Sequence, residues 1–155
     1  RCQKLEFRLP PREEALAWLR AQGHSASAQE TLDAARGHPG LAAQWLADGS
    51  LDLRREVMED LRALSQGRAS ATATAQRWNA DESLALRLRF AAELALEAAG
   101  RLTDPARTRR LAAWFAAANR SRGLLRTTVR ADLVVVDLLL QWPVAGERGL
   151  AGTKA

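Results

Sequence analysis

Apolar residues recur at helical spacing along almost the whole chain, and the first nine residues are the exception. Leu5, Phe7 and Leu9 alternate with polar residues, which is the period-two pattern of an extended strand. We expect residues 1–9 to be an edge strand or a connector. From residue 10 onward the spacing predicts helices, and therefore an all-α fold with a small three-helix unit followed by a bundle of about five helices.

Three short helices are predicted within residues 10–49, each bounded by residues that start or end helices. Ser27 and Glu30 have the spacing of a capping box at the start of the second helix. Gly37 suits the left-handed conformation that follows a helix C-terminus. The other boundaries are marked by Pro10-Pro11, Gly23, Pro39 and Asp48-Gly49. A unit this small usually needs a neighbour that buries its apolar face.

Longer helices are predicted after residue 49, where we place a domain boundary. Leu53, Val57, Leu61 and Leu64 recur about once per turn in the first of them. A second helix is predicted to run to Trp78, a third to end at Gly100 and a fourth to begin at Asp104-Pro105. The predicted N-caps of the first and third helices are Ser50 and Asp81.

The last apolar segment is predicted to be a helix, although residues 133–136 have strand propensity. Thr128 offers an N-cap, the apolar segment extends to Trp142, and a lone strand would have no partner among helices. A helix that is apolar on nearly all sides is predicted to be central and buried. Pro143 ends it, and residues 144–155 are predicted to form a mobile tail.

Composition excludes several classes of protein. The 155 residues contain one cysteine, Cys2, and two histidines, His24 and His38, which cannot form a zinc site of the usual spacing or an internal disulfide. Phosphate-binding loops, serine-hydrolase elbows and zinc-protease motifs are absent from the sequence. We expect neither catalysis by this chain nor a bound metal or cofactor, and we expect a cytoplasmic setting.

Basic residues are concentrated in one stretch. The net charge is +5, and residues 101–130 contain eight arginines against one acid, Asp104. Such a surface could bind nucleic acid. However, the arginines spread around the helix at about 100° per residue, and no aromatic residues interleave with them for base stacking. We favour a solvated surface. We expect Trp18, Trp45, Trp78 and Trp114 to be core residues.

Three segments resemble the lid and collar regions of bacterial DNA polymerase III clamp-loader subunits. They are Arg1-Cys2, Gly37-His38-Pro39-Gly40-Leu41-Ala42, and the stretch from Thr128 to Leu140. In this family an Arg-Cys pair supplies an arginine finger to ATP held by a neighbouring subunit, so the resemblance makes Arg1 a candidate finger in trans. Gly40 falls where ATPase members carry a nucleotide-sensing arginine, a departure that resembles the delta-prime type of subunit.

The resemblance implies an assembly role in DNA replication. Residues 1–49 would be an AAA+ lid, and residues 50–143 would be a collar that forms hetero-oligomers through Leu133, Val136 and Leu140. The implied partners are the clamp-loader ATPase (gamma/tau) and delta subunits, and indirectly the sliding clamp and primer-template DNA. The implied role is that of a stator in clamp loading. The alternatives are the collar of the ATPase subunit itself and a stand-alone helical nucleic-acid-binding module.

Overall fold

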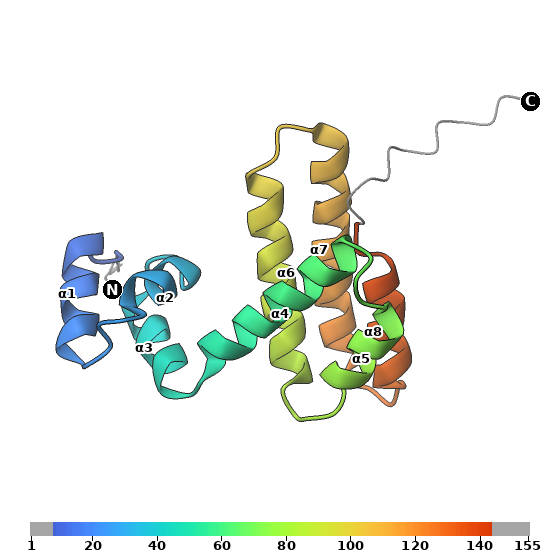
Figure 1. Cartoon of the computed structure of the whole chain (residues 1–155), viewed down its shortest axis with the longest axis horizontal. Helices are drawn as coiled ribbons and strands as arrows, with labels where there is room; N and C mark the ends of the chain where they lie inside the picture. The colour runs from blue at the N-terminus through green and yellow to red at the C-terminus, as the bar shows by residue number, and fades with distance from the viewer. Residues whose placement is uncertain (1–7, 144–155) are drawn as a thin grey trace, which may run out of the picture. The chain divides into compact units, whose positions relative to one another are not determined.

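The computed structural model describes residues 8–143, and these residues form eight α-helices and no strand (Figure 1). The prediction of an all-α fold is therefore confirmed. Arg8 and Leu9 lie outside any regular element, and the rest of the predicted extended segment, like the predicted tail, falls outside the described residues. The chain divides into two compact units between Leu53 and Arg54, four residues after the predicted boundary.

The first unit contains three short helices that all contact one another: α1 (Arg12–Ala21), α2 (Ala28–Ala34) and α3 (Pro39–Ala47). Arg12 at the start of α1 forms a two-point ion pair with Asp33 of α2, in which Nη2 lies 3.0 Å from Oδ2. This arrangement holds the pKa of the Asp33 carboxyl below its ordinary value, chiefly through the hydrogen bond from Arg12. The core of the unit consists of Ala15, Leu19, Ala28, Leu32, Ala35, Ala42 and Trp45.

Local predictions for this unit are wrong at Ser27 and Trp18 and confirmed at Gly37 and Trp45. Ser27 is the residue before α2, but its side chain makes no capping hydrogen bond; instead the Thr31 hydroxyl donates to the Ser27 carbonyl at 2.7 Å. Trp18 is 45% exposed, because it lies about 60° from Ala15 and about 100° from Leu19 around α1, at the edge of the buried face. Gly37 has a φ of +81°, the left-handed conformation predicted after α2.

The second unit is built from the longer helices. They are α4 (Ser50–Ser65), whose first turn belongs to the first unit, α5 (Ala71–Trp78), α6 (Leu84–Gly100), α7 (Pro105–Leu124) and α8 (Ala131–Leu140). Helices α6 and α7 lie side by side, and α8 contacts both α5 and α7 (Figure 1). Small buried side chains allow the close approach of α6 and α7: Ala91, Ala92, Ala95 and Ala118 are all at most 2% exposed.

Helix starts in this unit agree with the predictions only in part. Asp104 caps α7 by accepting a hydrogen bond from the Ala106 amide at 2.9 Å, as its position before Pro105 indicates. Ser50 does not cap α4 but is its first residue, and the Asp48 carboxylate accepts from its amide at 2.9 Å. The predicted cap at Thr128 is also wrong, because α8 begins at Ala131.

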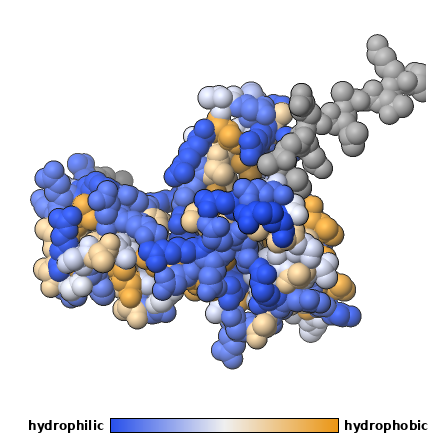
Figure 2. All heavy atoms as spheres, viewed as in Figure 1, coloured by the Kyte–Doolittle hydropathy of each residue, from blue (hydrophilic) through white to orange (hydrophobic). Residues whose placement is uncertain are grey.

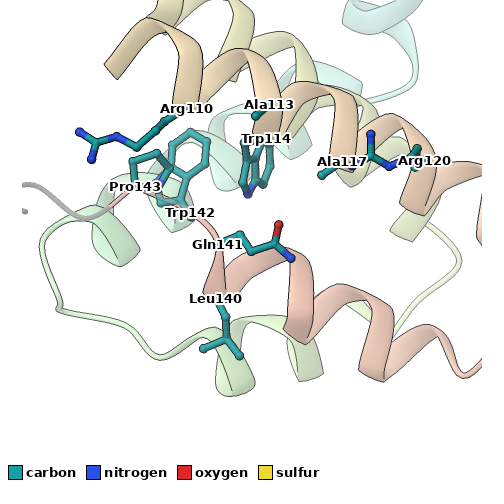
Figure 3. Close-up of a pocket in the computed structure, with 9 residues that line it drawn as sticks. All are labelled: Arg110, Ala113, Trp114, Ala117, Arg120, Leu140, Gln141, Trp142 and Pro143. Carbon is teal, nitrogen blue, oxygen red and sulfur yellow. The ribbon is translucent and has the colours of Figure 1, made fainter. Parts of the chain in front are cut away.

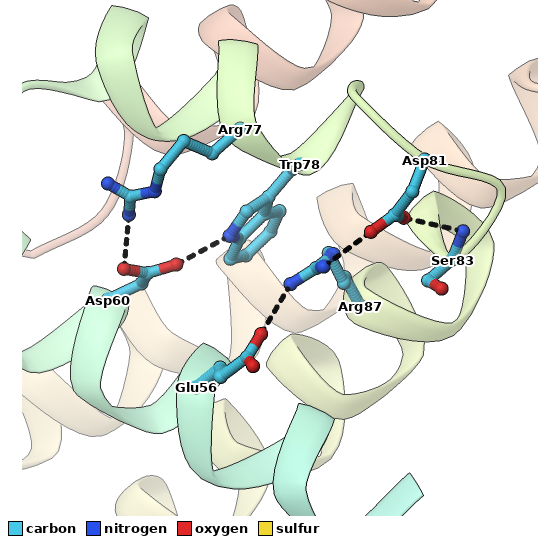
Figure 4. Close-up of polar contacts among 7 residues, drawn as sticks. All are labelled: Glu56, Asp60, Arg77, Trp78, Asp81, Ser83 and Arg87. Carbon is cyan, nitrogen blue, oxygen red and sulfur yellow. Dashed lines mark hydrogen bonds and ion pairs between the residues drawn. The ribbon is translucent and has the colours of Figure 1, made fainter. Parts of the chain in front are cut away.

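Asp81 is likewise not the cap of α6, which begins three residues later. One of its oxygens accepts from the Ser83 amide at 2.8 Å, and the other accepts from Arg87 at 2.8 Å (Figure 4). These hydrogen bonds, that from Arg87 above all, lower the pKa of Asp81 below its ordinary value. Arg87 also donates to Glu56 of α4 at 3.1 Å, so this largely buried arginine ties α4 to α6.

A second polar cluster ties α4 to α5. Trp78 is fully buried, and its indole N–H donates to one carboxylate oxygen of Asp60 at 2.8 Å. Arg77 pairs with the other oxygen of the same carboxylate (Figure 4). The Asp60 side chain is only 19% exposed. Neighbouring Glu59, by contrast, pairs with Arg62 at the surface.

We predict that Asp60→Ala lowers the free energy of unfolding by about 1–3 kcal/mol, because it leaves the buried Trp78 N–H without a partner. The matched control is Glu59→Ala, which removes an exposed pair from the same helix and should change stability by less than about 1 kcal/mol. Urea denaturation of both variants measures the difference. Equal losses of stability in the two variants would contradict the role given to Asp60.

Candidate functional site: the exposed face of helix α8

Helix α8 has one buried and one exposed apolar face. Its inward residues, Val135, Leu138 and Leu139, are at most 2% exposed, whereas Leu133 is 58% and Leu140 is 69% exposed. The residues predicted to form an oligomer interface, Leu133, Val136 and Leu140, are spaced by three and four positions and so share one side of the helix. We call these three residues the α8 face. The structure brings all three together.

The α8 face corrects the prediction that this helix is buried on all sides. Among residues 8–143, α8 is covered from the side of α5 and α7, and its opposite side remains open. Hydrophobic residues reach the surface at the edge of the second unit where α8 lies (Figure 2). Large aliphatic side chains grouped at the surface are typical of an interaction site, whereas scattered ones are not.

Two tryptophans fasten α8 to its neighbours. The Trp114 indole N–H of α7 donates to the Leu138 carbonyl of α8 at 2.9 Å. The Trp142 indole N–H, just after α8, is shared between the Leu61 carbonyl at 2.9 Å and the Ser65 hydroxyl at 2.7 Å, both in α4. The two rings meet edge to face, with centroids 4.7 Å apart and planes inclined by 75°. The C-terminal end of α8 is therefore held by both α7 and α4.

Charged residues at the ends of α8 are paired locally. Arg130 precedes the helix and pairs with Asp132 at 2.6 Å, and its hydrogen bond is the main reason that the pKa of Asp132 lies below its ordinary value. The Asp132 carboxylate also lies in the first turn, where negative charge is favourable. Asp137 is exposed and accepts from the Gln141 amide at 2.9 Å, as expected of an acid in an apolar helix.

The other predicted site residues lie in the first unit or outside the described residues. Gly40 is an exposed residue in the first turn of α3, and a Cβ atom added there would meet nothing within 4 Å. His38 is the N-cap residue of α3, without a side-chain capping bond. Arg1 falls outside residues 8–143. No group of three or more histidine, cysteine or acidic side chains in the described part of the chain could hold a metal ion.

Sequence reasoning missed the part played by Trp142. It treated this residue only as the end of an apolar segment, although a tryptophan beside a helix stop carries an N–H that needs a partner when buried. Arg87 was also missed, because a buried arginine within a leucine- and alanine-rich helix leaves no periodic signal.

None of the helices in residues 8–143 has the length and apolar character needed to cross a membrane.

Comparisons of the chain with models of protein families, with curated proteins and with solved structures find no match. The likeness to clamp-loader subunits therefore rests on the residues quoted from the sequence.

Proposed function

We propose that this chain is the lid and collar region of a delta-prime-like subunit of a bacterial DNA polymerase III clamp loader, and that its role is hetero-oligomer assembly. The observation that carries the proposal is the α8 face. It lies in the segment whose sequence resembles the final collar helix, and it leaves Leu133 and Leu140 more than half exposed. A division into one unit of three short helices and one of longer helices is compatible with a lid followed by a collar.

The energetics of the α8 face favour a protein partner. Burying a leucine side chain fully contributes about 1.5–3 kcal/mol, so Leu133 and Leu140 together could supply a substantial part of an association free energy. The face needs little reorganisation before binding, because the inner side of α8 is already packed and its C-terminal end is held by Trp114 and Trp142. A rigid surface loses less conformational entropy when it binds.

The proposed partners are the clamp-loader ATPase (gamma/tau) and delta subunits. Within such a complex this subunit would act as a stator, while its partners bind ATP, open the sliding clamp and let it close on primer-template DNA. Gly40 supports a subunit that does not sense nucleotide with its lid, because glycine offers no side chain to a phosphate. Arg1 would be the group that this subunit contributes to a neighbour's ATP.

We predict that the double variant Leu133→Ser and Leu140→Ser weakens assembly with the ATPase and delta subunits by about a hundredfold, since each lost leucine contact is worth roughly one factor of ten or more. Size-exclusion chromatography with light scattering at a series of concentrations measures the effect. The matched control is Leu96→Ser, which replaces a leucine that is 39% exposed on α6. Equal assembly by the double variant and the control would contradict the proposal.

A separate prediction concerns Arg1. Arg1→Ala should leave the complex assembled but slow ATP hydrolysis at the neighbouring site, on the order of a thousandfold as for arginine fingers of other nucleotidases. Arg1→Lys should restore little activity, because an ammonium lacks the planar fork of a guanidinium. Single-turnover hydrolysis by the purified complex is the measurement. Unchanged hydrolysis by the Arg1→Ala complex would remove Arg1 from the proposal and leave the assembly role intact.

A further inference from the structure

A pocket of about 410 Å³ lies between α7 and the C-terminal end of α8, on the second unit (Figure 3). Its volume is within the range of about 300–1,000 Å³ that is usual for ligand sites. Helix α7 contributes Trp114 together with Ala113 and Ala117, whose small side chains leave the space open. The opposite wall is formed by Leu140, Gln141, Trp142 and Pro143.

The pocket has a mixed lining, in which the polar side chains of Arg110, Arg120 and Gln141 stand beside Ala113, Ala117 and the two tryptophans. Both indole N–H groups are engaged elsewhere, that of Trp114 with Leu138 and that of Trp142 with Leu61 and Ser65. The Gln141 amide nitrogen is engaged with Asp137. A group that enters the middle of the pocket therefore meets Ala113, Ala117 and the half-buried Trp142, while Trp114 lies almost wholly buried beneath them. Such a surface suits an aliphatic or aromatic side chain.

The rim of the pocket is cationic at both ends. Arg110 and Arg120 are exposed, lie on the same side of α7 as Ala113 and Ala117, and stand at opposite ends of the pocket (Figure 3). Ten residues of helix separate them by about 15 Å along the axis. No carboxylate lines the pocket, and neither arginine has an ion-pair partner within residues 8–143.

We propose that this pocket binds an acidic peptide segment of a partner protein. One apolar side chain of the segment enters between Trp114, Ala117 and Trp142, and carboxylates on either side of it pair with Arg110 and Arg120. A guanidinium binds a carboxylate through two parallel hydrogen bonds, which fixes direction as well as adding affinity. The span of about 15 Å matches four or five residues of an extended peptide.

The geometry favours a peptide over a nucleic acid. A nucleic-acid strand carries a charge on every nucleotide and is held by a continuous basic track with stacking platforms. Between Arg110 and Arg120 the pocket contains Ala113 and Ala117 and no further cation. Trp114 is 2% exposed and presents no open face for a base.

The test uses the full 155-residue chain and a fluorescein-labelled probe peptide in which a central Leu-Phe pair is flanked by three acidic residues on each side. Fluorescence polarisation at low salt measures binding. Reversing both rim charges, with Arg110→Glu and Arg120→Glu, should weaken binding at least about tenfold. The matched control is Arg107→Glu with Arg109→Glu, which reverses two exposed α7 charges outside the pocket and should change binding much less.

Two further measurements separate the pocket from general charge attraction. Ala117→Trp fills the pocket without changing charge and should also weaken binding about tenfold. A probe in which Ser-Ser replaces Leu-Phe should bind at least about tenfold more weakly, because it lacks the apolar anchor. Circular dichroism confirms that each variant is folded.

The proposal is overturned if the wild-type chain does not bind the probe, if the Ser-Ser probe binds equally well, or if the two double variants behave alike. It is also overturned if a single-stranded oligonucleotide of equal charge displaces the probe more strongly than unlabelled peptide does. These outcomes need no other protein and so do not depend on the proposed assembly role. That role is tested with other proteins at Leu133, outside the pocket, and at Leu140, which also lines it. If the wild-type chain binds the probe but does not assemble with the clamp-loader subunits, the assembly role alone is contradicted.

Discussion

The position of α8 depends on two indole hydrogen bonds. Trp114 reaches from α7 to the Leu138 carbonyl, and Trp142 reaches from the end of α8 to Leu61 and Ser65 of α4. The two rings also pack edge to face. A short apolar helix has few polar groups with which to fix its orientation, so these contacts decide which side of α8 faces inward. The exposed α8 face and the pocket beside Trp142 both follow from that orientation.

Helix α4 supports the same arrangement through hydrogen bonds made by its charged side chains. Arg54 donates to Glu97 of α6 at 2.8 Å, Glu56 accepts from Arg87, and Asp60 accepts from Trp78. These contacts place α4 against α5 and α6, while Leu61 and Ser65 of the same helix receive Trp142. A change in α4 is thus expected to affect α8, although the two helices are distant in sequence. The second unit depends on tryptophan and arginine as much as on its aliphatic core.

The helices were predictable from the sequence because their signals are local. Helix signals depend on residues within one or two turns of one another. Asp104-Pro105 starts α7, and Gly37 has the left-handed conformation that follows α2, both as predicted. The predicted caps at Ser27, Ser50, Asp81 and Thr128 were wrong. Short polar side chains can also bond to groups near a helix start without capping it. Asp81, for example, pairs with Arg87, a contact that depends on how the loop enters α6.

The candidate site was predictable only in part. The resemblance to the collar helix implied Leu133, Val136 and Leu140 as an interface, but which side of α8 is exposed depends on α5 and α7, which lie elsewhere in the sequence. The pocket could not be predicted, because it forms between the Arg110–Arg120 side of α7 and residues 140–143 and has no motif of its own. The assignment to a clamp loader remains a proposal, supported by a resemblance in three segments and by the exposed α8 face.

The most direct test of that assignment measures whether partners cover α8. With Cys2→Ser as background, Leu133→Cys and Ala112→Cys each place a single exposed thiol, on α8 and on α7 respectively. Maleimide labelling is followed for each variant alone and with the clamp-loader ATPase and delta subunits. We predict that the partners slow labelling at position 133 and leave position 112 unchanged. Equal labelling rates at position 133 with and without the partners would contradict the proposed assembly surface.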